Sequence, residues 1–241
     1  MLTKAETKLI RSLREKKHRA ETGLFLVEGA KSVEELLRSN FAISFIVATD
    51  AFAKTLKTKM RVETVSADEL AKLGTLEAND AAIAVVKQKS AQTAEQKNQG
   101  LILVLDEVKD PGNLGTIIRI ADWYGVKRIL ASKGTADFYN AKTIAASMGS
   151  FTRIAVEYAD LAEFFSKNTL PVFGAYLGGE NVHEMKFPSD GILVMGNESN
   201  GISAHLEKFI TKKITIPRYG SAESLNVAIA TAVILDNWKR K

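Results

Sequence analysis

The chain has 241 residues, 46% of them hydrophobic and 25% charged, which is an ordinary globular composition and enough length for one small and one medium domain. It contains no cysteine, so disulfides, thiolate metal sites and a cysteine nucleophile are excluded. The formal charge is +5, and residues 1–19 alone hold seven Lys or Arg against two Glu. This excess favours a polyanionic partner, although a charged run is also typical of a solvated helix face.

The beginning of the chain carries no apolar run of the kind found in a secretory signal. Apolar stretches elsewhere, such as residues 100–105 and 227–235, are far shorter than a membrane span. We therefore expect a soluble, cytoplasmic protein without a membrane partner.

Helices and strands alternate through the first part of the chain. Apolar spacing predicts helices over residues 3–19, 30–38, 52–58 and 68–73, and strands over residues 24–27, 45–48, 62–65 and 82–86. This alternation predicts a small α/β domain over residues 1–90. The stretch that follows is polar and aperiodic, which predicts a linker over residues 91–99.

Residues 100–241 predict a second domain. Its expected strands are 101–105, 128–131, 152–156, 171–175, 192–195 and 214–216, and its expected helices are 113–124, 141–148, 161–167, 204–210 and 224–238. The strand cores are apolar without alternation, which indicates a parallel sheet covered on both faces. Ligands of such sheets bind at the carboxyl ends of the strands, where three polar, glycine-bearing clusters lie.

The first cluster is DPGNLGTIIR, residues 110–119. Pro111-Gly112 forces a turn, Asn113 is placed to cap the next helix, and Arg119 projects from an otherwise apolar helix. These features fit a plain turn with a surface arginine or a nucleotide site. A dinucleotide-binding dehydrogenase is disfavoured, because GNLG is not GxGxxG and the next strand does not end in an acidic residue.

The other two clusters follow later strands. In GNESNGIS, residues 196–203, Glu198 is placed either to accept hydrogen bonds from ribose hydroxyls or to sit in an ordinary polar turn. In residues 214–238, Ser224 and Asn226 begin a helix that is apolar on nearly every side, so we expect it to be buried in the core or against another subunit. Ser224 could also be a simple helix cap. The three histidines are scattered, so we expect no metal site.

Taken together, the three clusters resemble the three motifs of the SpoU/TrmH branch of the SPOUT methyltransferases. DPGNLGTIIRIADWYGV resembles the first motif, VMGNESNGIS the second and IPRYGSAESLNVAIA the third, so the resemblance spans residues 100–241. The front of the chain, KLIRSLREKKHRAETGLFLVEG, resembles the family's substrate-binding domain, a small α/β domain akin to RNA-binding ribosomal proteins. The resemblance implies a mainly parallel α/β fold with a deep trefoil knot, and homodimers with the active site at the subunit interface.

The resemblance also implies the site residues. The catalytic positions would be Arg119, Asn113, Glu198, Ser224 and Asn226. The S-adenosyl-L-methionine pocket, largely backbone, would be formed by Leu177, Gly178, Met195, Gly196, Asn197, Gly201, Ile216 and Leu225. RNA contacts are expected at Lys8, Arg11, Lys16, Lys17 and Arg19. One departure from the family pattern is Arg218-Tyr219, where an apolar residue is expected first.

The implied reaction is methyl transfer from S-adenosylmethionine to a ribose 2′-hydroxyl of RNA, ribosomal RNA being expected before transfer RNA. Arg119 would act either as an unusual general base or by binding a phosphate or the forming alkoxide, because a guanidinium rarely loses its proton. The alternatives are a transfer-RNA methyltransferase and a catalytically inactive RNA-binding or ribosome-assembly factor of the same fold.

Overall fold

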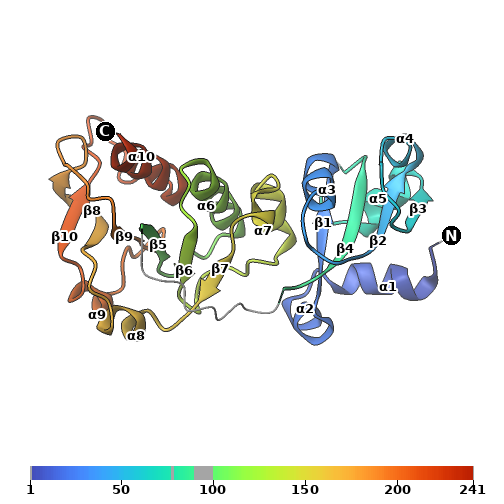
Figure 1. The fold of residues 1–241 in the computed structure, drawn as a ribbon, viewed down its shortest axis with the longest axis horizontal. Helices are drawn as coiled ribbons and strands as arrows, with labels where there is room; N and C mark the ends of the chain where they lie inside the picture. Colours follow the sequence, from blue (N-terminus) through green and yellow to red (C-terminus); the bar gives the residue numbers. More distant parts are fainter. Residues whose placement is uncertain (1, 77–78, 90–99, 241) are drawn as a thin grey trace. The chain divides into compact units, whose positions relative to one another are not determined.

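The computed structural model describes residues 2–76, 79–89 and 100–240, so the predicted linker over 91–99 lies outside the described residues. The chain divides into two compact units, each built on its own sheet (Figure 1). The first unit combines the described residues up to 89 with Asp137–Thr152. The second unit contains residues 100–136 and those from Arg153 onward.

The first unit contains a four-stranded mixed sheet of order β1-β4-β2-β3. The central strand β4 runs antiparallel to both β1 and β2, whereas β3 runs parallel to β2. The strands are β1 (Leu24–Glu28), β2 (Ile43–Thr49), β3 (Val62–Val65) and β4 (Ala82–Lys87). The helices are α1 (Lys4–Ser12), α2 (Lys16–Thr22), α3 (Ala30–Leu37), α4 (Asp50–Ala53), α5 (Ala67–Leu73) and α7 (Ala141–Ala146), with a 3-10 turn η1 (Ser150–Thr152).

Helices cover both faces of this sheet. On one face, Ile10 of α1 and Leu70 of α5 pack against strand residues such as Val47 and Ile83. On the other face, the rings of Phe25, Phe41 and Phe151 form a triangle with centroid separations of 5.8 to 6.3 Å. Phe151 is only 2% exposed, so the segment from Asp137 to Thr152 completes the core of the first unit although it lies far along the chain.

The helix predicted over residues 3–19 is wrong, because the structure has two helices there, with a break between Ser12 and Lys16. The break leaves the main-chain oxygens of Leu13 and Arg14 without helical partners. The guanidinium of Arg19 donates to both oxygens, at 2.9 and 2.7 Å. A buried side chain from α2 thus stabilises the end of α1, which local periodicity could not reveal.

The second unit contains a six-stranded sheet of order β10-β8-β9-β5-β6-β7, in which every strand pair is parallel. The strands are β5 (Leu101–Leu105), β6 (Arg128–Ala131), β7 (Val156–Tyr158), β8 (Val172–Asn181), β9 (Gly191–Met195) and β10 (Lys212–Thr215). The helices are α6 (Pro111–Trp123), α8 (Leu161–Ser166), α9 (Ala204–Glu207) and α10 (Val227–Lys239). The predicted parallel sheet is confirmed.

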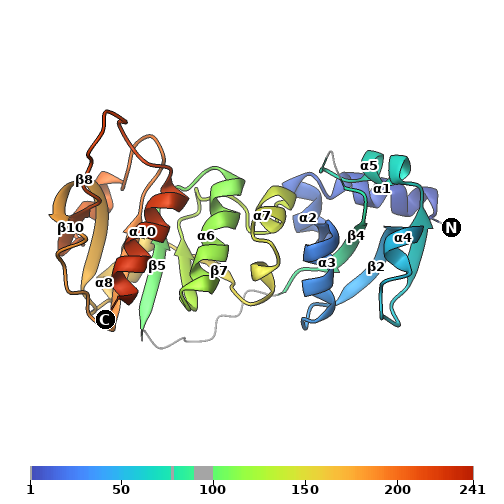
Figure 2. The ribbon, with the colours of Figure 1, turned by 90° about the horizontal axis from the view of Figure 1, so that it is seen from above.

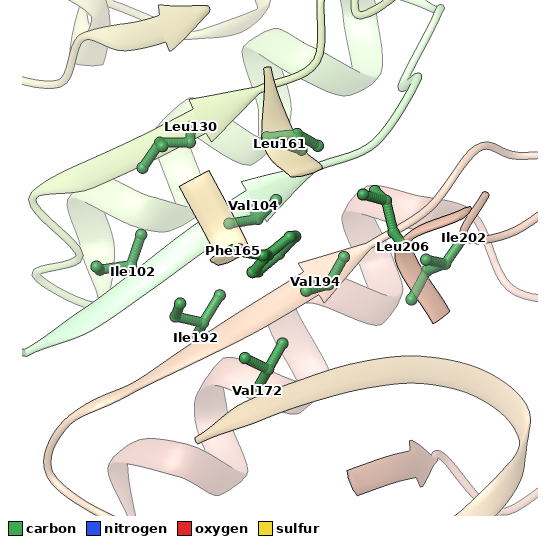
Figure 3. Close-up of a cluster of buried hydrophobic side chains, with 10 residues drawn as sticks. All are labelled: Ile102, Val104, Leu130, Leu161, Phe165, Val172, Ile192, Val194, Ile202 and Leu206. Atoms are coloured by element: carbon green, nitrogen blue, oxygen red, sulfur yellow. The ribbon is translucent and has the colours of Figure 1, made fainter. Parts of the chain in front are cut away.

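Both faces of the second sheet are covered, as the unbroken apolar strands predict. Helices α6 and α10 lie side by side on one face, and α8 and α9 lie on the other (Figures 1 and 2). Under α8 and α9, Phe165 and Leu206 pack against Val104, Ile192 and Val194 of the central strands (Figure 3). Each such side chain contributes roughly 1.5–3 kcal/mol when buried, so the sheet is a rigid base for its loops.

Candidate active site

Three loops leave the carboxyl edge of the second sheet: residues 106–110 after β5, residues 196–203 after β9 and residues 216–226 after β10. Because these strands are parallel, their carboxyl ends meet at one edge, where α/β proteins bind ligands. The three polar clusters of the sequence are therefore carried to one side of the second unit.

Side chains from the first turn of α6, the loop after β9 and the loop after β10 join in one hydrogen-bonded chain. The amide nitrogen of Asn226 donates to Asn113 Oδ1 at 2.8 Å, and the amide nitrogen of Asn113 donates to Glu198 Oε1, also at 2.8 Å. The other carboxylate oxygen of Glu198 accepts a long bond of 3.4 Å from the backbone nitrogen of Lys109. Glu198 and Asn226 are exposed, so the chain of polar groups is open to a ligand.

Helix capping sets the direction of this hydrogen-bonded chain. Asn226 is the N-cap of α10, and its Oδ1 accepts bonds from the backbone nitrogens of Ala228 and Ile229. Its nitrogen must therefore face Asn113, which in turn must present its own nitrogen to Glu198. The predicted cap at Asn113 is wrong, because Asp110 caps α6 and accepts from the backbone nitrogen of Asn113 at 2.9 Å.

The loop after β9 is closed by two glycines. Asn197 and Gly201 exchange two backbone hydrogen bonds, at 2.9 and 3.0 Å, and a Cβ atom on Gly196 would lie 2.2 Å from the carbonyl carbon of Gly201. The Asn197 side chain also donates to the Glu107 carbonyl at 2.8 Å. Glu107 has a φ of 55°, so a left-handed residue of one loop is held by an amide of the next.

Sequence reasoning did not assign a role to Asp106, which follows β5 directly. Its carboxyl group is 2% exposed and accepts a hydrogen bond from the backbone nitrogen of Ser203 at 2.7 Å. Asp106 therefore joins the loop after β5 to the loop after β9, and Asp110 fixes the start of α6. The helix-capping preference of aspartate before Pro-Gly could have identified Asp110, whereas no local signal marks Asp106.

Two of the residues expected at the cofactor lie in an interruption of β8. Pairing with β10 passes from Gly174 opposite Lys213 to Glu180 opposite Ile214, so residues 175–179 bulge out of the sheet. Within the bulge, Leu177 is 82% exposed, and nothing lies within 4 Å of a Cβ placed on Gly178. Exposed apolar side chains beside open backbone fit a flat heteroaromatic ring such as adenine.

The remaining cofactor candidates are spread over the other loops. Leu225 is half exposed, Ile216 is half-buried, and Met195 is buried at the end of β9. Gly196, Asn197 and Gly201 form the closed loop described above. S-adenosylmethionine fits this set, because the sulfonium cofactor needs apolar contact for its adenine and exposed backbone for its polar edges.

Two predicted catalytic residues are not part of the hydrogen-bonded chain. Arg119 lies on α6 and is exposed; six residues after Asn113, it points about 120° away around the helix axis. Ser224 is exposed and precedes α10, so the helix predicted to begin there starts three residues later. Both side chains are free of the protein core and accessible to a substrate.

The basic residues of the first unit divide into two groups. Lys8, Arg11, Lys16 and Lys17 are exposed on α1 and α2. Arg19, by contrast, is 3% exposed, and its guanidinium donates to Asp137 Oδ2 at 2.6 and 3.2 Å. Arg19 therefore stands apart from the exposed group, because its guanidinium donates to Asp137 and to the end of α1.

The described residues contain no helix long and apolar enough to cross a membrane. Within the same residues, no group of three or more His, Cys, Asp or Glu side chains is arranged to hold a metal ion.

A small α/β domain followed in the chain by a parallel α/β unit with three motif loops at one edge defines an enzyme of the SPOUT methyltransferase class. Residues 100–236 match the SpoU rRNA Methylase family, and residues 4–84 match the MRM3-like substrate binding domain. The chain belongs to the SpoU rRNA methylase family. Its sheet order is consistent with the predicted knotted fold, and the predicted family and fold class are confirmed.

Three relatives illustrate the similarity. The 23S rRNA (guanosine(2553)-2′-O)-methyltransferase RlmP of Bacillus subtilis is 32% identical and covers 93% of this chain and 92% of its own. A solved TrmH-family RNA methyltransferase structure from Porphyromonas gingivalis is 36% identical, with a TM-score of 0.86 over 99% of this chain and 98% of that one. An rRNA methyltransferase from Sinorhizobium meliloti, solved with AdoMet bound, is 31% identical, with a TM-score of 0.85 over 98% and 95%.

Proposed function

We propose that this protein transfers a methyl group from S-adenosylmethionine to a ribose 2′-hydroxyl of ribosomal RNA. The observation that carries the proposal is the hydrogen-bonded chain Asn226–Asn113–Glu198, which joins the three family motifs in one open site. Similarity to RlmP over nearly the whole chain supports a ribosomal substrate, and the AdoMet-bound relative supports the cofactor.

Bound S-adenosylmethionine supplies an electrophilic methyl group, so the protein's task is to hold the ribose in line with it. Glu198 has one long hydrogen bond on Oε2, which leaves lone pairs able to accept from ribose hydroxyls. The bulge of residues 175–179, the loop of residues 196–203, and Ile216 and Leu225 from the loop after β10 would hold the cofactor, mainly through backbone groups and the apolar side chains of Leu177 and Leu225.

Arg119 is best suited to bind a phosphate or the forming alkoxide. A guanidinium exposed to water keeps its charge, and Arg119 is exposed on α6. A fixed positive charge beside the 2′-oxygen would stabilise the developing negative charge during transfer. The general-base alternative requires a desolvated guanidinium, which an exposed side chain reaches only when substrate covers it.

We further propose that the protein is a homodimer through the second unit. Trp123 at the end of α6 is 84% exposed, and Ile229 on α10 is 53% exposed, although both helices otherwise bury apolar faces. An aspartate at either position should shift the protein toward monomer in light scattering, whereas Met60→Asp in the first unit should not.

The first unit would bind the RNA. Its exposed lysines and arginines on α1 and α2 provide sequence-independent attraction to phosphates, and its match to a substrate binding domain supports the same role. We propose residues 1–90 as this domain and residues 100–241 as the catalytic part, with Asp137–Thr152 packed into the core of the first unit.

Methyl transfer into defined RNAs tests the proposal. Unmodified 23S rRNA transcript, 16S transcript and bulk tRNA would be incubated with the protein and radiolabelled S-adenosylmethionine, and the product mapped by mass spectrometry. Label at a ribose of 23S rRNA is the expected result. Cofactor and RNA binding without transfer would instead support the inactive assembly factor, and preferential labelling of tRNA would assign the other substrate.

A further inference from the structure

Tyr219 is the most exposed large hydrophobic side chain among the described residues, at 92%. It lies in the loop of residues 216–226, which projects from the second unit between β10 and α10 (Figure 2). An aromatic ring that stays in water contributes no burial free energy to the stability of the fold. A fully exposed ring in a loop that ends at the candidate active site is available to contact a ligand.

The neighbouring residue has matching chemistry. Arg218 is also exposed, and one of its nitrogens lies 3.5 Å from the carbonyl oxygen of Ala222, at the limit of a hydrogen bond. This weak contact holds the arginine within the loop while its remaining donors stay free for a ligand. An exposed aromatic ring beside an exposed guanidinium is the combination that stacks on a base and binds the adjacent phosphate.

The loop is anchored at both ends. Ile216 and Pro217 are half-buried after β10, whereas Asn226 caps α10 and donates to Asn113 in the candidate active site. Asn226 lies seven residues after Tyr219, so the Cα atoms of the two residues are at most about 25 Å apart. A strand of RNA with its target ribose at Asn113 and Glu198 would pass within reach of this loop.

We propose that Tyr219 stacks on a nucleobase of the substrate RNA next to the methylated nucleotide, and that Arg218 binds a neighbouring phosphate. The proposal rests on the proposed RNA methyltransferase function, whose target ribose it helps to position. Stacking needs only an aromatic face, so this contact holds the strand in the site and does not select its sequence.

Four variants of the full-length protein test the proposal: Tyr219→Ala, Tyr219→Trp, Arg218→Ala and Arg218→Lys. With unmodified 23S rRNA transcript, Tyr219→Ala should lower kcat/KM about ten- to one-hundredfold, and Tyr219→Trp should retain it within about threefold. Arg218→Ala should weaken RNA binding and reduce the salt slope of the binding constant by about one, whereas Arg218→Lys should keep that slope. Affinity for S-adenosylmethionine, measured by calorimetry, should not change in any of them.

Three outcomes would overturn the proposal. Wild-type kinetics in Tyr219→Ala would show that the ring contacts nothing, and weaker S-adenosylmethionine binding would show that it covers the cofactor. A change in oligomeric state would show that a second copy of the chain covers it. A crosslink from 4-thiouridine-substituted transcript to Tyr219 supports stacking even if no methyl transfer is found, so failure of the inference and failure of the proposed function are distinguishable.

Discussion

Asn226 is held in one orientation by the helix that it begins, and this fixes the direction of its hydrogen bond to Asn113. Its side-chain oxygen is occupied by the first backbone nitrogens of α10, so only its nitrogen can face Asn113. One residue thus combines a structural task with a place in the candidate active site, and the two can be separated by substitution.

Asn226→Asp should keep the helix cap of α10 and lose the hydrogen bond to Asn113. Aspartate caps helices as well as asparagine does, so the free energy of unfolding should stay within about 0.5 kcal/mol of wild type. It cannot donate to Asn113, so methyl transfer should fall at least tenfold. Asn226→Ala should lose activity and also about 1 kcal/mol of stability in urea unfolding. Full activity in Asn226→Asp would remove the hydrogen-bonded chain from the mechanism.

Arg119→Ala should lower the rate of methyl transfer by about a hundredfold or more, while S-adenosylmethionine still binds. Because the side chain is exposed on α6, stability should change by less than about 0.5 kcal/mol. A pH–rate profile of Arg119→Lys addresses the role. If Arg119 acts as a fixed charge, Arg119→Lys should be partly active with an unchanged pH–rate profile. If Arg119 acts as a general base, the lysine variant should show an additional pH-dependent step in the profile. Normal turnover in Arg119→Ala would contradict both roles.

Arg19→Ala should destabilise the protein by about 3 kcal/mol, because it leaves Asp137 and two carbonyl oxygens without their partner in a buried setting. Lys16→Ala, an exposed change on the same helix, is the matched control and should cost less than about 0.5 kcal/mol. For RNA binding the larger effect should come from Lys16→Ala, which should reduce the salt dependence of the RNA-binding constant. Equal stability of the two variants would refute the buried role of Arg19.

Gly196→Ala should disturb the closed loop after β9. The added methyl group would overlap the backbone of Gly201, so we expect a loss of about 1–3 kcal/mol in the free energy of unfolding, together with weaker cofactor binding. Gly178→Ala is the control for stability, because its Cβ would meet nothing within 4 Å. Thermal unfolding of the two variants checks the difference, and a Gly196→Ala protein as stable as wild type would contradict the observed packing.

Acid should weaken one contact of the first unit. Hydrogen bonds from Arg61 and Thr3 lower the pKa of Glu6 from 4.5 to about 2. Since the pKa of the folded state is the lower one, the ionised carboxylate stabilises the fold above about pH 4.5, and this contribution is lost as pH falls toward 2. The stability difference between wild type and Glu6→Gln should therefore shrink over that range in urea unfolding; a constant difference would exclude the linkage.

Most strand positions and the grouping of three polar loops could be predicted from the sequence, because apolar runs and the rules of parallel sheets determine both. The strand predicted over residues 152–156 is wrong, because a 3-10 turn ends at Thr152 and β7 begins only at Val156. The helix limits could not be predicted. Ser224 and Asn226 are both good caps, and Asn226, which caps α10, also bonds Asn113, 113 residues away. Arg19 has the sequence context of a surface charge, and only the distant Asp137 makes it a buried one. Such contacts leave no periodic signal in the chain.

The buried pair Arg19–Asp137 and the ring of Phe151 also bear on how proteins of this kind can be recombined. A gene fusion that exchanged only residues 1–89 for another substrate domain would leave Asp137 and Phe151 facing a foreign surface. The part of the chain that can be exchanged is therefore discontinuous, and residues 1–89 and 137–152 must be replaced together. Chimaeras should fold when residues 137–152, which include α7, come from the same parent as residues 1–89.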